Sequence, residues 1–418
     1  MNKVFVMMLI VGTGLLYAAK PGLEYIPYRQ DEIFRQIDEN REIEKSVSDS
    51  LTREILDRQE KEAKKKKDER RRLRWNMADV KRPSSPSIFQ QIFHFDPTHQ
   101  DATGTCWSYS ATSLIESETA RLTGKKIKLS EMHTVYYEYL EKARRFVQER
   151  GDSFMGQGSQ INSALRIMGW YGIVPESVYP GKNGEYHDHS RMFKEIKSYL
   201  DFVKENEIWE EERVLNGVRV ILNHFLGEPP VQFEFAGKIW TPKQFASEFL
   251  EFRVDDYVDL MSTMAYPFNS YAVFDVPDNW WRDSSYYNVP LDTWMNVLKH
   301  AVTNGFSVAI GGDISEPSLY EDLDIAVVAL VDIPSKLINQ ESREYRIYNG
   351  STTDDHGIHI IGYTRHAGWD WYLIKDSSSD GRAGEFFGYL FYREDFIKLK
   401  MLGYTVHRDA AEKILGTF

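Results

Sequence analysis

The sequence predicts an α+β protein with a helical lobe, a β-rich lobe and a cleft between them, preceded by a helical extension. Two observations predict this fold class. Helical spacing of apolar residues fills the chain after residue 100, whereas short apolar or alternating runs bounded by turn residues fill it after residue 300. A helical half followed by a strand-rich half is typical of segregated α+β folds.

The N-terminal stretch "MNKVFVMMLIVGTGLLYAAK" holds one lysine, a short apolar core and two alanines near its end. This pattern is typical of a secretory signal peptide and is short for a membrane-spanning helix. We predict a signal peptide over residues 1–19, cleaved near Ala18 or Ala19, and hence a secreted or periplasmic protein with no integral membrane span after cleavage. The segment contains no cysteine, which excludes a lipid anchor on that residue.

Residues 20–80 are predicted to form a charged helical extension. Ile43, Val47, Leu51 and Ile55 recur four residues apart, which is helical spacing. The main interpretation is a solvated helix with charged faces. A propeptide, an assembly helix that forms a homo-oligomer, and a contact with an anionic surface are the alternatives.

The linker "KRPSSPS" then opens a domain that spans residues 81–418. Helices are predicted at 108–122, closed by Gly124, and at 129–146 and 161–172. A mostly helical and aromatic insertion without obvious chemistry is predicted at about 191–300. Short strands are predicted over residues 306–314, 325–333, 356–364, 369–377 and 388–395.

Composition narrows the function classes. The net charge of -12 argues against a general affinity for nucleic acid or acidic membranes. The basic run "KKKKDERRRLR" does not reverse this conclusion, because no aromatic residue interleaves with it before Trp75.

Cys106 is the one cysteine of the chain. Exported proteins commonly use cysteines in disulfide pairs, so an odd thiol indicates an intermolecular link or a reactive group. Cys106 is predicted to open the first helix of the domain, where the helix dipole stabilises a thiolate. Gln100 lies six residues earlier, and its amide is suited to donate to a developing oxyanion.

A nucleophilic thiolate also needs a base, and "TTDDHGIHIIGY" offers two histidines. His356 is expected at the mouth of a strand and is favoured as the base, whereas His359 lies within an apolar run and is read as a core residue. Asp376, at the end of another apolar run, is the candidate that orients the imidazole. No cofactor or metal is expected, because the acidic stretch that starts at Asp376 lacks the glutamate that completes a calcium loop.

Three stretches in the order Cys, His, Asp resemble a known family. "QDATGTCWSYS" resembles the active-site segment of papain-like cysteine peptidases, "DHGIHIIGY" their histidine strand, and "WYLIKDS" their third motif. "GQGSQINSALRIMGWYGIVPESVYP" and the insertion resemble the bleomycin hydrolase and bacterial aminopeptidase C branch. The resemblance covers roughly residues 88–406 and implies a two-lobed papain-like fold over the domain at 81–418.

The resemblance also implies roles. Cys106 would attack a peptide carbonyl as thiolate, His356 would serve as base and then acid, and Asp376 would orient His356. Gln100 and the Cys106 N–H would form the oxyanion hole. Two further residues, Gly158 and Trp107, would contact the peptide or protein substrate.

Three departures from the family pattern qualify these roles. Asp376 replaces the family's Asn, and Ser378 replaces a Trp that shields the imidazole contact, so a wetter and weaker pair is expected. The chain stops at "AAEKILGTF", without the branch's arm in the cleft, so exopeptidase and endopeptidase action both stay open. A catalytically weak binding or assembly protein is the alternative function.

Overall fold

The computed structural model describes residues 32–69, 76–77, 79–181, 186–315, 318–416 and 418. The predicted signal peptide and the start of the predicted extension lie outside these residues. The chain divides into two units, Met1–Leu73 and Arg74–Phe418, close to the predicted boundary at residue 80.

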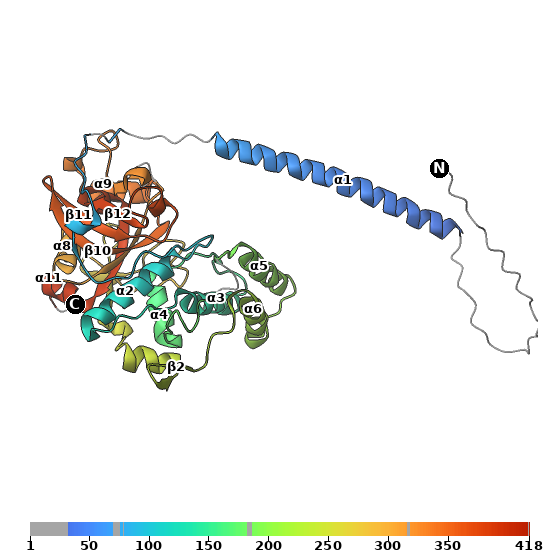
Figure 1. Cartoon of the computed structure of the whole chain (residues 1–418), viewed down its shortest axis with the longest axis horizontal. Coiled ribbons are helices and arrows are strands. Elements are labelled where there is room, and N and C mark those ends of the chain that lie inside the picture. Colours follow the sequence, from blue (N-terminus) through green and yellow to red (C-terminus); the bar gives the residue numbers. More distant parts are fainter. Residues whose placement is uncertain (1–31, 70–75, 78, 182–185, 316–317, 417) are drawn as a thin grey trace, which may run out of the picture. The chain divides into compact units, whose positions relative to one another are not determined.

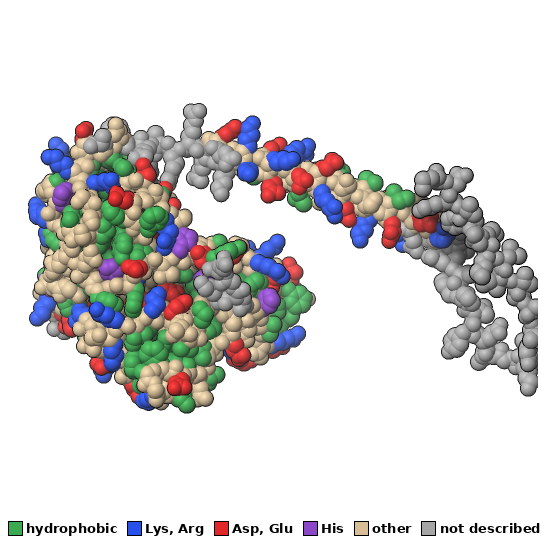
Figure 2. Space-filling view, in the orientation of Figure 1, with side chains coloured by type: hydrophobic (Ala, Val, Ile, Leu, Met, Phe, Trp, Pro, Cys, Tyr) green, Lys and Arg blue, Asp and Glu red, His purple; other side chains and the backbone are tan. Residues whose placement is uncertain are grey.

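The described residues of the first unit form a long helix, α1 (Glu32–Asp68). Ile43, Val47 and Leu51 of its apolar positions are 57–62% exposed. Figure 2 shows charged side chains of both signs along this helix. This surface matches the predicted solvated helix, and a homo-oligomer formed through it stays a prediction.

The second unit has a helical lobe and a sheet lobe (Figure 1). In the helical lobe, α2 begins at Cys106 and ends before Gly124, whose positive φ of 74° closes the helix as predicted. The helices of this unit are α2 (Cys106–Thr123), α3 (Glu131–Gln148), α4 (Ile161–Tyr171), α5 (Ser190–Glu205), α6 (Glu211–Leu226), α7 (Pro242–Gln244), α8 (Leu291–Thr303), α9 (Gln340–Tyr348), α10 (Glu394–Lys400) and α11 (Arg408–Leu415).

The sheet lobe is built on one sheet of mainly antiparallel strands. Their order is β5-β6-β4-β13-β7-β10-β11-β12-β9-β8, with β1 paired to β10. The strands of this sheet are β1 (Gln90–Gln91), β4 (Tyr257–Met261), β5 (Ser270–Ala272), β6 (Tyr286–Asn288), β7 (Val308–Gly312), β8 (Leu319–Tyr320), β9 (Ile325–Ala326), β10 (His356–His366), β11 (Trp369–Lys375), β12 (Tyr389–Arg393) and β13 (Met401–His407). A separate hairpin consists of β2 (Phe233–Phe235) and β3 (Lys238–Trp240).

Two sequence predictions need correction. The insertion at 191–300 is helical only in part, because residues 257–288 contribute β4, β5 and β6 to the main sheet. The strand predicted at 325–333 is limited to residues 325–326, although the following apolar residues through Ala329 are buried. In both places burial among distant segments decides the backbone, and local periodicity does not reveal it.

Each lobe has its own apolar core. One core joins α2 to α6 and the aromatic residues around β2 and β3, and a second lies between the sheet and α8, α10 and α11. Helix α2 packs against β10 and β7, so the start of the helix and the start of β10 meet between the lobes. No helix in the part of the chain described here is long and apolar enough to cross a membrane.

Candidate active site

Cys106 is the first residue of α2 and follows Thr105, the N-cap residue. The backbone N–H groups of a first helical turn have no acceptor inside the helix, and the helix dipole places partial positive charge there. The thiol is partly exposed to solvent. This position suits both a thiolate and the binding of an oxyanion.

His356 begins β10, and Asp376 directly follows β11. The imidazole Nε2 lies 2.7 Å from Asp376 Oδ1, and His356 and Cys106 line the same pocket. The Gly357 N–H also donates to Cys106 Sγ over 3.5 Å. The structure therefore brings Cys106, His356 and Asp376 together from three separate elements, as the sequence predicts.

The electrostatics of this group favour a charged imidazole. Burial by itself lowers the pKa of His356, but the negative charge of Asp376, and then that of Cys106, raises it well above the ordinary histidine value. Burial acts to raise the pKa of Asp376, yet the charge of His356 and the hydrogen bonds it accepts hold it below the ordinary value. The raised pKa of His356 and the lowered pKa of Asp376 both favour an imidazolium–carboxylate pair.

The prediction of a wet, weak third residue is wrong. Asp376 is only 1% exposed. Ser378 donates twice to its carboxylate, from Oγ to Oδ2 over 2.6 Å and from its N–H to Oδ1 over 3.1 Å. Gly381 lies over the same carboxylate, since a Cβ built there would be 3.0 Å from Asp376 Oδ2. A loop covers the contact here, and Ser378 holds the carboxylate in place.

The second histidine of β10 lies in the core, as predicted. His359 is 1% exposed, and its Nδ1 lies 2.9 Å from Ser113 Oγ. Lys375 donates to the same hydroxyl over 2.9 Å. Burial, and after it the charge of Lys375, holds the pKa of His359 well below the ordinary value. A neutral, enclosed imidazole without contact to Cys106 is suited to packing, which favours His356 as the base.

Gln100 is held between the loop before α2 and the loop after β11. Its Oε1 accepts from Ser377 Oγ over 2.8 Å, and its Nε2 donates to the Thr103 carbonyl over 2.7 Å. An amide carries two N–H groups, and the other makes no further hydrogen bond among the described residues. Gln100 is thus held in the loop before α2 with one donor to spare, although it is not among the residues that line the pocket of Cys106 and His356.

Comparison with known proteins gives the family. Residues 42–408 match the model of the Peptidase C1-like family. The chain belongs to this family. It is therefore a cysteine-type peptidase, and the predicted papain-like resemblance is confirmed. The match begins within α1, whereas the motifs of the sequence reach back only to residue 88.

Individual relatives agree with this assignment. Aminopeptidase C of Lactococcus lactis subsp. cremoris is 22% identical, over 75% of this chain and 81% of the relative. Cysteine proteinase 1, mitochondrial, of Saccharomyces cerevisiae is 21% identical, over 54% of this chain and 56% of that protein. The crystal structure of PepW from Lactobacillus rhamnosis HN001 superposes with a TM-score of 0.63 at 17% identity, covering 79% of this chain and 84% of that one. This likeness confirms the two-lobed papain-like fold.

Cys106 and His356 line one pocket with residues of both lobes. Its lining consists of Cys106, Trp107, Ser159, Gln160, Ile161, Asp278, Gly311, Asp354, Asp355, His356 and Gly357. Trp107 is 1% exposed, and its indole N–H lies 3.1 Å from both the Gly104 and the Gln157 carbonyl oxygens. Its side chain thus ties together two loops that border the pocket.

Three carboxylates of this pocket, Asp278, Asp354 and Asp355, were not singled out as site residues from the sequence. Asp354 stands two residues before His356, where the pair of aspartates was visible but had no assigned role. Asp278 belongs to the stretch "VPDNWW" inside the insertion, and no local pattern marks it. Only the fold brings Asp278 to the pocket of Cys106 and His356.

Proposed function

We propose that this peptidase is an exported aminopeptidase that hydrolyses peptide bonds through Cys106, His356, Asp376 and Gln100. The observation that carries the proposal is the buried His356–Asp376 pair, 2.7 Å apart, whose imidazole shares one pocket with a cysteine at a helix N-terminus. The aminopeptidase part is supported by the similarity to Aminopeptidase C of Lactococcus lactis subsp. cremoris.

The proposed chemistry follows the charges of the site. The Cys106 thiolate attacks the scissile carbonyl carbon, and a new S–C bond forms as the carbonyl electrons move to oxygen. The Cys106 N–H and the Gln100 amide stabilise this oxyanion. His356 then gives its proton to the leaving amine, and the C–N bond breaks to leave a thioester. Water, deprotonated by His356, hydrolyses the thioester and restores Cys106.

Export is supported by the sequence of residues 1–19. N-terminal sequencing of the protein recovered outside the cytoplasm of its producing cell tests this part. We expect a mature chain that starts just after Ala18 or Ala19. A chain that keeps Met1 and stays with the cells would contradict export without affecting the proposed chemistry.

Cys106→Ala tests the nucleophile. We expect complete loss of hydrolysis on a panel of aminoacyl coumarylamides, with a melting temperature close to that of the unchanged protein because the lost group is small. Thr123→Ala, at the other end of α2, is the matched control and should keep full activity. Retained hydrolysis in Cys106→Ala would refute the assignment. A folded parent chain that binds peptides but neither cleaves them nor reacts with iodoacetamide would instead be a binding protein.

A further inference from the structure

One carboxylate of the catalytic pocket has no partner in the described chain. Asp278 lines the pocket with Cys106 and His356, and its side chain makes no hydrogen bond or ion pair with any described residue. Burial raises the pKa of Asp278. The positive charge of Lys142 acts in the opposite direction but offsets this effect only in part, so the pKa stays raised. A partly buried carboxylate without donors is costly unless a ligand supplies them.

Asp278 lies directly against Gly158, the residue that the family resemblance assigns to substrate binding. A Cβ built on Gly158 would be 2.1 Å from Asp278 Oδ2, so a larger residue at this position would require Asp278 to move. The side chain of Asp278 therefore occupies the space over the Gly158 backbone, where an extended peptide would pass.

The backbone carbonyl of Gly158 already accepts a hydrogen bond from a side chain of this protein. Lys142 is fully buried, and its ammonium donates to the carbonyl oxygens of Gly156, over 2.8 Å, and of Gly158. A residue that holds an extended peptide as an antiparallel partner uses both its N–H and its C=O. Since Lys142 already binds the Gly158 carbonyl, a peptide that continues past Asp278 loses part of that pairing.

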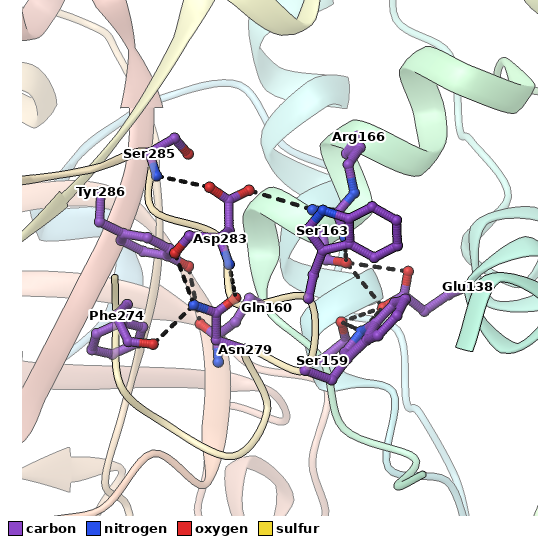
Figure 3. Close-up of polar contacts among 12 residues, drawn as sticks. Glu138, Ser159, Gln160, Ser163, Arg166, Phe274, Asn279, Asp283, Ser285 and Tyr286 are labelled. Carbon is purple, nitrogen blue, oxygen red and sulfur yellow. Dashed lines mark hydrogen bonds and ion pairs between the residues drawn. The ribbon is translucent and has the colours of Figure 1, made fainter. Parts of the chain in front are cut away.

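The loop that carries Asp278 is firmly anchored (Figure 3). Next to it, the Asn279 side chain donates to the carbonyls of Phe274 and Asp283 over 2.9 and 3.0 Å. The Trp280 indole N–H donates to Glu138 Oε1 over 2.6 Å. These bonds close the loop on itself and tie it to α3.

A second bond ties the same loop to α4. The Asp283 carboxylate lies 3.3 Å from Arg166 Nη1, and Figure 3 shows the two side chains facing each other. Anchored at two helices, the loop holds Asp278 at a fixed place in the pocket.

A second carboxylate of the pocket lies close enough to Asp278 to feel its charge. Burial, and among further causes the charge of Asp278, raises the pKa of Asp354 to about 7. One oxygen of Asp354 accepts from Gln160 Nε2 over 2.5 Å, and Gln160 in turn accepts from the Tyr286 hydroxyl over 3.3 Å. Two nearby carboxylates in one pocket are best satisfied by a bound cation with several donors, such as a primary ammonium.

We propose that Asp278, assisted by Asp354, binds the free α-ammonium of the peptide substrate and blocks the cleft beyond it. The amine of the residue that is cleaved off would lie beside Gly158, and no earlier residue would fit past Asp278. The inference rests on the proposed peptidase chemistry at Cys106 and names the group that makes it remove single N-terminal residues.

The test compares aminoacyl coumarylamides with their N-acetylated counterparts, for the unchanged protein and for Asp278→Asn. We expect the unchanged protein to prefer the free amines strongly. In Asp278→Asn, kcat/KM for the free amines should fall about 100-fold, as is typical when one partner of a desolvated charge pair is removed. The value for the acetylated substrates should stay level or rise. Asp354→Asn should show the same change to a smaller extent.

Asp275→Asn is the matched control, because Asp275 lies on the same loop but is exposed. It should leave both substrate classes unchanged. Equal loss on both classes in Asp278→Asn, with a lower melting temperature, would mean that Asp278 only balances the charge of Lys142, and would overturn the inference. Equal use of free and acetylated substrates by the unchanged protein would overturn it without any variant. Turnover of neither class would refute the proposed peptidase function itself, which is a distinguishable outcome.

Discussion

Two aspartates beside the candidate catalytic residues differ in their donors: Asp376 contacts His356, whereas Asp278 lines the pocket of Cys106 and His356. In the sheet lobe, Asp376 is 1% exposed and accepts from His356 and twice from Ser378, so its pKa is lowered. Asp278, which lines the pocket of Cys106 and His356, accepts from no described residue, and its pKa is raised by burial. A carboxylate supplied with donors is a fixed part of the site, whereas one without donors is available to a ligand.

The largest effect on activity is expected from changing His356 in the sheet lobe. His356→Ala should lower kcat/KM by at least about 10⁴-fold, since residues that act as one catalytic unit are each indispensable. His359→Gln, three residues along the same strand, should mainly lower the melting temperature because His359 only packs in the core. Steady-state kinetics and thermal melts of both variants check this, and the opposite ranking of the two histidines would contradict our assignment of the base.

A smaller effect is expected for Asp376→Asn. The amide oxygen can still accept from His356 and from the Ser378 N–H, and the amide nitrogen can donate to Ser378 Oγ, so kcat/KM should stay within about tenfold. Removing the negative charge lowers the pKa of His356. The imidazolium then loses its proton at lower pH, and the basic limb of the rate profile should move to lower pH.

The pH dependence of folding stability should also reflect the His356–Asp376 pair. The raised pKa of His356 stabilises the folded state fully below the ordinary value of 6.5, and this contribution is lost as the pH rises through the raised value. The lowered pKa of Asp376 stabilises the fold above the ordinary 3.8, and this contribution is lost as the pH falls through the lowered value. The melting temperatures of Asp376→Asn and the unchanged protein should therefore differ most between these two ordinary values. An unchanged pH profile in both measurements would show that Asp376 does not charge His356.

The smallest effect is expected from changing Trp280, which anchors the loop that carries Asp278. Trp280→Phe keeps an aromatic ring but removes the N–H that Glu138 and Ser159 accept over 2.6 and 3.1 Å. The free energy of unfolding should fall by about 1–3 kcal/mol because a buried acceptor loses its donor. KM for free-amine substrates should rise a few-fold with little change in kcat, since Asp278 is then held less firmly.

Trp281→Phe is the matched control for the anchor, because its indole N–H donates to no described residue. It should change KM less than Trp280→Phe does. Denaturant unfolding and steady-state kinetics measure both variants. An unchanged KM in a destabilised Trp280→Phe protein would separate the anchoring of the loop from the recognition of substrate.

The sequence by itself determined the elements whose pattern is local. The helices α2, α3 and α4 and the strands β7, β10, β11 and β12 follow from periodicity and from turn residues at their ends. It also placed Cys106 at a helix start and His356 at a strand start, because those boundaries are set by the same local pattern.

Only the tertiary structure decided how distant segments meet. β13 and the strands β4 to β6 were not predicted, since their place in the sheet depends on partners far along the chain. The cover over Asp376, formed by Ser378 and Gly381, and the position of Asp278 over Gly158 arise in the same way. Loop side chains carry no periodic signal, so their contacts, burial and pKa values follow from packing that a linear pattern does not encode.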